Sequence, residues 1–339
     1  MRSSIVMRVD PDGDGLSPHV VELDGPPVGW VTVRVAASGV CFADVATSRT
    51  LPSESPITPG HEIAGEVVAV GAGVETGWIG ERVAVGWFGG SCTQCSYCRA
   101  GDPVHCHDRK IPGLSYPGGW AEFVTVPEDA LARVPDELSL FDAAPLGCAG
   151  VTTFNAIRRA NVAAGGRVAV FGIGGLGHLA VQFAARMGYE VVVIARGMAR
   201  EPLARQLGAH HYIDAESTEA GEVLRSLGGA DLLLSTASTT EPLAGLLPGL
   251  RVGGRLCIVG VDGGVLEVPT AVLTMKSIVV TGHLTGSARD IEETMRFAVL
   301  NNVRPIIERM PLEEAAGAVE RLTRGNARFR IVLDATSER

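Results

Sequence analysis

The stretch RVAVFGIGGLG, residues 167–177, decides the fold. Arg167–Phe171 is a continuous apolar strand, and it runs directly into Gly172-Ile173-Gly174-Gly175-Leu176-Gly177. The apolar spacing of Gly177–Met187 then predicts a helix. A G-x-G-x-x-G turn between strand and helix is typical of dinucleotide binding, because the glycines make the turn and let the backbone reach a pyrophosphate at the helix N-terminus. The sequence therefore predicts a dinucleotide-binding domain with Gly172, Gly174, Gly175, Leu176 and Gly177 beside the cofactor.

Strands and helices alternate on both sides of this stretch. A helix is predicted over Arg200–Leu207, and further strands are predicted at Val191–Ala195, Tyr212–Ile213, Asp231–Ser235, Arg255–Val259 and Ser277–Thr281. This alternation predicts a doubly wound parallel sheet covered by helices on both faces. From Gly29 to about Val134 the pattern is instead β-rich, with short valine-rich runs divided by Gly, Pro and Asp. The fold class is therefore α/β with a second, β-rich domain.

The end of the second strand bears on the choice of dinucleotide. It reads Ile194-Ala195-Arg196-Gly197, with Arg200 shortly after and no carboxylate. An NAD site usually has Asp or Glu here, whereas a small residue followed by arginine accommodates the 2′-phosphate of NADP. We therefore expect NADP(H) rather than NAD(H), with Ala195, Arg196 and Arg200 at its adenosine end. The alternative is that both arginines are solvated charges at the entry to a helix.

Composition excludes several classes of function. The chain has 339 residues, enough for about two domains, and its 46% hydrophobic and 20% charged residues are ordinary for a globular protein. A net charge of −9 disfavours a nucleic-acid partner. No apolar run approaches the roughly 20 residues of a membrane span, and residues 1–15 contain no signal-peptide core. We expect a cytoplasmic protein without membrane or nucleic-acid partners.

Four of the seven cysteines cluster as C-x-x-C-x-x-C-x(7)-C, at Cys92, Cys95, Cys98 and Cys106. Two-residue gaps let consecutive thiolates surround one ion at about 2.3 Å, and four thiolates leave no open coordination position. The spacing predicts a structural zinc. Two disulfides are disfavoured in the cytosol, and an iron–sulfur cluster is the weaker alternative, since it also accepts four thiolates.

A second group of potential zinc ligands is scattered along the chain. Cys41 lies in Gly39-Val40-Cys41, His61 and Glu62 follow Gly60, and Cys148 lies in Gly147-Cys148-Ala149-Gly150. Two cysteines and one histidine from distant segments are what a catalytic zinc uses, with its fourth position kept for water or substrate. Singly, each residue is as well explained by a turn or a small core side chain. Together they predict an open metal site that polarises a substrate oxygen.

These motifs, in this order, resemble the zinc-dependent alcohol dehydrogenases of the medium-chain dehydrogenase/reductase superfamily. Further segments that match lie at Gly118-Gly119-Trp120-Ala121-Glu122, at Cys148–Thr152 and at residues 325–330. The resemblance implies a GroES-like catalytic domain over residues 1–150, with the zinc lobe at 91–107, a Rossmann domain over 151–286, and a C-terminal return to the catalytic domain over 287–339. It implies a homodimer or homotetramer that acts on a small alcohol or aldehyde.

The resemblance also implies roles for single residues. Cys41, His61 and Cys148 would bind the catalytic zinc, with Glu62 as an intermittent or outer ligand, and Asp44 would orient His61. The expected cofactor contacts are Phe42, Thr152, Leu176, Val259, Gly260, Val261 and, at the pyrophosphate, Arg330.

The sequence departs from the family pattern along one path. Family members commonly carry Ser or Thr where this chain has Ala43, and some place a relay histidine where it has Ala46. Alanine cannot relay the alcohol proton. Three hypotheses follow: hydride transfer between NAD(P)(H) and a primary alcohol or aldehyde with another proton route, NADPH-dependent reduction of an activated C=C or C=N bond, and a non-enzymatic binding role. The complete ligand set favours the first.

Overall fold

The chain forms two compact units. The computed structural model describes residues 2–9, 15–50 and 57–336. Residues 1–151 and 285–339 form the first unit, and residues 152–284 form the second. The sequence places the corresponding divisions after residues 150 and 286.

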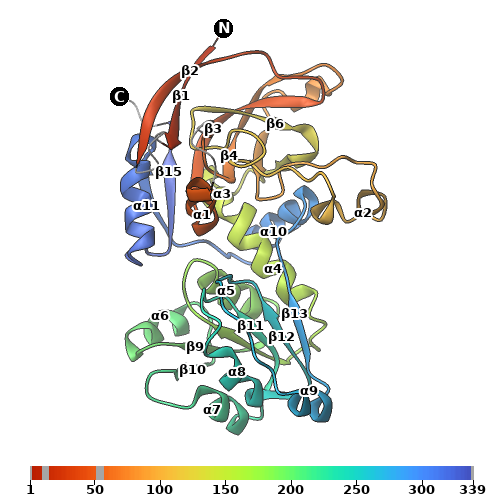
Figure 1. Cartoon of the computed structure of the whole chain (residues 1–339), viewed down its shortest axis with the longest axis vertical. Helices are drawn as coiled ribbons and strands as arrows, with labels where there is room; N and C mark the ends of the chain where they lie inside the picture. Colours follow the sequence, from red (N-terminus) through yellow and green to blue (C-terminus); the bar gives the residue numbers. More distant parts are fainter. Residues whose placement is uncertain (1, 10–14, 51–56, 337–339) are drawn as a thin grey trace. The chain divides into compact units, whose positions relative to one another are not determined.

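The second unit is built on a six-stranded parallel sheet (Figure 1). Its strand order, β10-β9-β8-β11-β12-β13, is that of a doubly wound dinucleotide-binding domain, so the predicted fold class is confirmed. The carboxyl ends of β8 and β11 meet where this order reverses. The strands are β8 (Arg167–Phe171), β9 (Glu190–Ala195), β10 (His211–Asp214), β11 (Ala230–Ser235), β12 (Leu250–Ile258) and β13 (Val279–Gly282).

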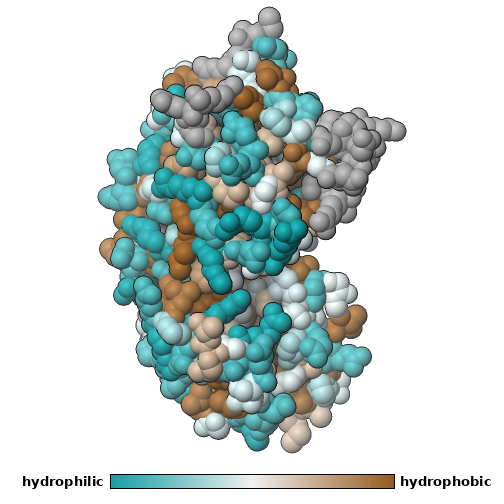
Figure 2. Space-filling model, turned by 90° about the vertical axis from the view of Figure 1, so that its left-hand side faces the viewer, coloured by the Kyte–Doolittle hydropathy of each residue, from teal (hydrophilic) through white to brown (hydrophobic). Residues whose placement is uncertain are grey.

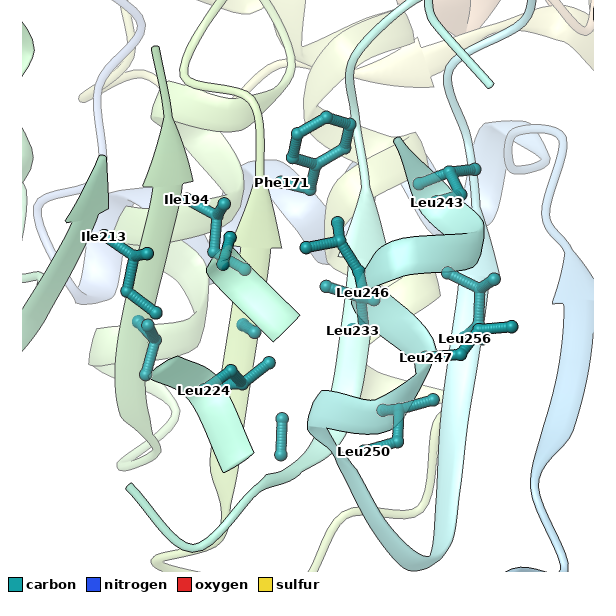
Figure 3. Packing of buried hydrophobic residues seen from close by; sticks show 14 of the residues in the cluster. Phe171, Ile194, Ile213, Leu224, Leu233, Leu243, Leu246, Leu247, Leu250 and Leu256 are labelled. Carbon is teal, nitrogen blue, oxygen red and sulfur yellow. The ribbon is translucent and has the colours of Figure 1, made fainter. Parts of the chain in front are cut away.

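Helices cover this sheet because its strands are apolar on both faces. The five residues from Val191 to Ala195 are all buried, and so is Phe171. Figure 3 shows leucines of α7 and α8, among them Leu224 and Leu246, packed onto the strands, with further helices behind the sheet. The helices are α4 (Val151–Arg158), α5 (Gly177–Arg186), α6 (Glu201–Gln206), α7 (Ala220–Ser226), α8 (Leu243–Leu246) and α9 (Thr270–Lys276), with short 3-10 turns η5 (Met198–Arg200) and η6 (Leu247–Gly249).

The first unit is β-rich, as predicted, and centres on a seven-stranded sheet. The antiparallel pair β3 and β4 forms its middle, and β15 from the end of the chain pairs with β3. Valines on the strands of this sheet form its core. The strands are β3 (Trp30–Val40), β4 (Glu62–Val70), β5 (Arg82–Val85), β6 (Phe123–Pro127), β7 (Ala132–Arg133), β14 (Ile307–Pro311) and β15 (Arg330–Asp334).

Short helices surround this sheet. Figure 1 shows α11 beside β15, where its alanines join a cluster with Ile331 and Leu333. The helices are α1 (Phe42–Thr50), α2 (Ser96–Arg99), α3 (Leu140–Pro145), α10 (Ala288–Leu300) and α11 (Ala315–Thr323). The shorter turns are η1 (Thr76–Trp78), η2 (Pro103–His105), η3 (Glu128–Ala130), the π-helical η4 (Leu146–Gly150) and η7 (Leu312–Glu314).

An N-terminal hairpin is the element that sequence patterning missed. β1 (Arg2–Val9) pairs antiparallel with β2 (Leu16–Leu23) outside the main sheet. Four of the eight residues of β2 are exposed and none is buried, so β2 lacks the apolar alternation that identifies a strand. Met7 is fully buried in the cluster beside α11, which anchors the hairpin.

The face drawn in Figure 2 is largely hydrophilic, with hydrophobic residues in scattered groups. No helix in the described part of the chain combines the length and apolar character that a membrane span requires.

Candidate metal centres and cofactor site

The scattered ligand candidates converge in the first unit. Cys41 directly follows β3 and His61 directly precedes β4, and the register pairs Gly39 with Glu62, so these two strand ends meet. Cys148 comes from the π-helical turn η4. One potential ligand atom from each of Cys41, His61, Glu62 and Cys148 lies within 4.8 Å of the others. Two thiols and an imidazole gathered in this way fit a zinc ion of the catalytic type.

Asp44, in the first turn of α1, fixes the imidazole. Both side chains are buried, and Asp44 Oδ1 lies 2.7 Å from His61 Nδ1. The same carboxylate accepts the backbone N–H groups of Cys41 at 3.0 Å and of Gly60 at 3.2 Å. Burial is the largest single effect on the pKa of His61 and lowers it, but the charge and hydrogen bond of Asp44, together with Cys41, raise this pKa to well above its usual value. With Nδ1–H donated to Asp44, Nε2 is left facing Cys148 Sγ at 3.3 Å, which is the ligand orientation that zinc needs.

The two thiols differ in acidity. A hydrogen bond with Cys148 holds the pKa of Cys41 well below its usual value, against the opposing effect of burial, and His61 lowers it further. The same hydrogen bond with Cys41, together with burial, raises the pKa of Cys148 well above its usual value. The pair therefore stabilises one thiolate and one thiol, and binding of a metal ion would release the proton of Cys148.

Glu62 forms an ion pair with Arg330, which is 268 positions away in the chain. The two side chains are 0% and 4% exposed. Burial raises the pKa of Glu62 to about 7, although the guanidinium of Arg330 lowers it. Gly39 is required here, since a Cβ at this position would lie 2.0 Å from Glu62 Oε2. No local pattern in the sequence indicates this pair, because it depends on β15 lying beside β3.

The four cysteines of the lobe also converge on one point. Cys92, Cys95, Cys98 and Cys106 bring their sulfur atoms within 4.8 Å of one another. Backbone N–H groups point at these sulfurs, from Cys95 to Cys92 Sγ and from Cys92 to Cys106 Sγ, each at 3.3 Å. Backbone hydrogen bonds from Cys98 and His107 lower the pKa of Cys95 to about 6. N–H donors around converging sulfurs stabilise thiolates, and the set fits a closed zinc site.

The glycine turn has the predicted form in the second unit. Gly172 follows β8 with a φ of +93°, and α5 begins at Gly177. A Cβ on Gly177 would lie 2.0 Å from the carbonyl oxygen of Gly172, so only glycine allows the helix to approach the strand so closely. In such domains, backbone N–H groups of this turn and of the helix N-terminus bind phosphate.

The two predicted arginines, Arg196 and Arg200, follow the end of β9 and lie at the surface of the second unit. Ala195 is buried, whereas Arg196 and Arg200 are exposed. Neither guanidinium forms an ion pair with any residue in the described part of the chain. Two carboxylates that no sequence motif indicated lie nearby, Asp214 at the end of β10 and Glu216 just after it. Asp214 accepts the N–H of Gly197 at 2.8 Å, and Glu216 Oε2 lies 3.5 Å from where a Cβ of Gly197 would be.

The remaining predicted cofactor residues lie on both units. Thr152, near the start of α4, is buried, and its hydroxyl donates to the carbonyl of Leu284 at 3.4 Å. Residues 259–261 follow β12, and Val261 is 81% exposed. Phe42 opens α1 with its side chain 53% exposed. Cys257, which the sequence assigns to a strand interior, is buried in β12.

Comparison with known proteins identifies the family. A family model described as Alcohol dehydrogenase GroES-like domain matches residues 27–136, and one described as Zinc-binding dehydrogenase matches residues 175–299. The chain is 40% identical to the alcohol dehydrogenase notN of Aspergillus sp. (strain MF297-2) over 92% of both chains. It is 33% identical to an alcohol dehydrogenase of Geobacillus stearothermophilus over 93% of this chain and 95% of that one.

Solved structures agree in fold. The cinnamyl alcohol dehydrogenase SbCAD4 of Sorghum bicolor superposes with a TM-score of 0.87 at 29% identity, covering 100% of this chain and 99% of that one. An enzyme titled CAD from Helicobacter pylori complexed with NADP(H) has the same TM-score at 28% identity, covering 99% of both chains. The chain therefore belongs to the zinc-dependent alcohol dehydrogenase family of the medium-chain dehydrogenase/reductase superfamily. It is an NAD(P)-dependent alcohol oxidoreductase of the zinc type.

Proposed function

We propose that this chain interconverts a primary alcohol and an aldehyde with NADP(H), and that it carries two zinc ions. Cys41, His61 and Cys148 hold the catalytic ion, with Glu62 beside it. The four lobe cysteines hold the structural ion. The convergence of these four ligand atoms within 4.8 Å of one another carries this proposal. Zinc, when bound there, acts as a Lewis acid that polarises the substrate oxygen.

The residues of this chain prepare that chemistry. Backbone N–H groups of Cys41 and Gly60 hold the carboxylate of Asp44 in place. The hydrogen bond between Asp44 and His61 Nδ1 then keeps the imidazole in one tautomer and one orientation. Arg330 neutralises Glu62, so the carboxylate does not add an unpaired charge beside the thiolates. In the second unit, Thr152 and Leu176 flank the nicotinamide, and the turn at Gly172, Gly174, Gly175 and Gly177 binds the pyrophosphate. Val259–Val261 and Phe42 complete the proposed cofactor contacts.

The proton takes an unusual route in this proposal. Ala43, in the first turn of α1, has no hydroxyl, and neither does Ala46. The alcohol proton then leaves through water, Glu62 or the cofactor ribose. Because a positioned acid–base group contributes about 10²-fold or more, we expect Ala43→Ser to raise alcohol oxidation by at least about tenfold. No rise in Ala43→Ser or Ala43→Thr would show that this chain already has a complete relay.

The exposed arginines Arg196 and Arg200 support NADP(H). Among related proteins, the Helicobacter pylori structure is titled as a complex with NADP(H), and a relative from Mycolicibacterium smegmatis, 35% identical, is named an NADP-dependent alcohol dehydrogenase. The discriminating measurement is the dissociation constant of each reduced cofactor by its fluorescence. Tighter binding of NADH than of NADPH would refute this part of the proposal.

The exposed edge of the parallel sheet supports a homodimer. β13 is the last strand of the sheet (Figure 1). Val279 and Val280 on it are 40% and 38% exposed. Met275 on α9 and Val265 are more than 80% exposed. A second copy pairing with β13 would cover these apolar side chains and continue the sheet. Sedimentation at equilibrium tests this, and a monomer at micromolar concentration would overturn it. The cysteine set, used as metal ligands, supports a cytoplasmic location.

The reaction itself is tested with zinc-loaded protein, NADPH and a panel of saturated and α,β-unsaturated aldehydes. We expect loss of the reduced-cofactor absorbance and formation of the alcohol. Formation of the saturated aldehyde from an unsaturated one would instead identify a reductase of activated C=C bonds, the alternative that Ala43 favours. If no aldehyde of the panel is reduced, both the alcohol dehydrogenase activity and the C=C reductase activity are contradicted.

A further inference from the structure

The peptide groups around Gly197 are held on two sides by residues of the neighbouring strand. Gly197 lies between Arg196 and η5, directly after β9. Its N–H donates to Asp214 Oδ1 at 2.8 Å, and its carbonyl accepts from the hydroxyl of Tyr212 at 2.6 Å. Both partners belong to β10, which pairs in parallel with β9 and aligns Asp214 with Ala195. Two side chains thus fix the position of one residue in the turn after β9.

Gly197 is in a conformation that other residues avoid. Its φ is +72° and its ψ is 154°, a region that is essentially reserved for glycine. The turn therefore needs glycine for its backbone path and needs the two hydrogen bonds to select that path among those open to glycine. Without Tyr212 and Asp214, the residues from Arg196 to Arg200 would have more conformations available.

The carboxylate of Asp214 serves this turn. Besides the N–H of Gly197, its carboxylate accepts the N–H of Glu216 at 3.0 Å and the hydroxyl of Ser217 at 2.9 Å. Hydrogen bonds from the backbone of Glu216 and Gly197 hold the pKa of Asp214 below its usual range. The carboxylate is therefore charged, and it orders the turn through three hydrogen bonds.

Tyr212 is a reliable donor at neutral pH. Burial raises the pKa of its hydroxyl, and the charge of Asp214 raises it further, whereas Arg200 lowers it. Tyr212 therefore keeps the proton that it donates to the carbonyl of Gly197.

We propose that Tyr212 and Asp214 are positioning residues for cofactor selection. They hold the Gly197 peptide so that Arg196 and Arg200 are presented together to the 2′-phosphate of the dinucleotide. The inference rests on the proposed preference for NADP(H), because it assigns to that preference the residues that shape its binding turn. It predicts that selectivity depends on a phenol and a carboxylate that themselves do not contact the phosphate.

The test compares Tyr212→Phe with Tyr189→Phe in the zinc-loaded protein. Tyr189 is a matched control in the same unit, where its hydroxyl donates to the carbonyl of Val162 at 3.4 Å, away from this turn. Dissociation constants for NADPH and NADH are measured by fluorescence, and those for adenosine 2′,5′-bisphosphate and 5′-AMP by calorimetry. We expect Tyr212→Phe to weaken the binding of NADPH and of the bisphosphate by roughly 3- to 10-fold, which is the effect of one hydrogen bond.

The dissociation constants of NADH and 5′-AMP should change by less than those of NADPH and the bisphosphate. In kinetics, the KM for NADPH should change more than kcat. Asp214→Asn, which removes the charge that strengthens the hydrogen bond from the Gly197 N–H, should reduce the same selectivity ratio. An unchanged ratio of NADPH to NADH affinity in both Tyr212→Phe and Asp214→Asn overturns the inference, as does an equal change in Tyr189→Phe. The affinities of the unaltered protein decide the proposed cofactor separately, since they do not depend on these variants.

Discussion

Replacing Arg330 by methionine tests the buried ion pair beside the zinc ligands. The substitution keeps much of the side-chain volume and removes the charge. Glu62, with 0% of its side chain exposed, would then lie next to Cys41 and Cys148 without its guanidinium partner. Removing one partner of a buried pair costs about 3–5 kcal/mol. For a unit of this size, 1 kcal/mol corresponds to about 2–4 °C, so the thermal midpoint should fall by roughly 6–20 °C.

The pH dependence of this loss has a definite sign. The pKa of Glu62 is about 7 in the folded chain, above its reference value of 4.5, and Arg330 opposes that rise. Without Arg330 the folded pKa rises further, so Glu62 of the variant takes up a proton near neutral pH. A carboxyl whose folded pKa is raised loses stability as the pH rises through that pKa. The destabilisation by Arg330→Met should therefore be larger in alkaline buffer than at neutral pH.

A double-mutant cycle separates the ion pair from packing. Thermal unfolding followed by circular dichroism is compared for Arg330→Met, Glu62→Gln and the double variant, each with and without zinc. Because the double variant leaves no buried charge unpaired, it should recover most of the stability that Arg330→Met loses. Two results would refute a role for the ion pair. One is a thermal midpoint of Arg330→Met equal to that of the unaltered protein at every pH, and the other is a double variant no more stable than Arg330→Met.

Three further predictions concern the metal centres and the parallel sheet. Asp44→Asn should weaken zinc binding at the catalytic site by about 10- to 100-fold, measured by competition with a chromogenic chelator; undiminished affinity would mean that Asp44 does not orient His61. Cys95→Ser should lose one of the two proposed zinc ions and lower the thermal midpoint, and metal analysis that finds unchanged zinc would contradict a four-thiolate site. Glu190→Gln should reduce stability above pH 4.5, since hydrogen bonds from His211 and Arg167 lower the pKa of Glu190 against the effect of burial. That difference should shrink as the pH falls below 4.5 in urea titrations, and a difference that is constant with pH would rule out the charge as its cause.

Sequence patterning predicted the parallel sheet well and the first unit less completely. The apolar runs of β8, β9 and β11 are buried on both faces, so their composition alone marks them as central strands. Neither the missed β2 nor β14 has a fully buried residue, so neither carries a hydrophobic signal. The turn that carries Cys148 is π-helical, and nothing in Gly147-Cys148-Ala149-Gly150 indicates that geometry.

The sequence by itself determined the features that rest on short-range geometry. Six residues around Gly172 define the phosphate turn, and the gaps between Cys92 and Cys106 define the lobe, because neighbouring residues can adopt only a few backbone arrangements. The tertiary structure alone decided which distant groups meet. Glu62 finds Arg330 because β15 pairs with β3, and Tyr212 and Asp214 reach Gly197 because β10 lies beside β9. Such contacts are set by the register between strands, which no local spacing encodes.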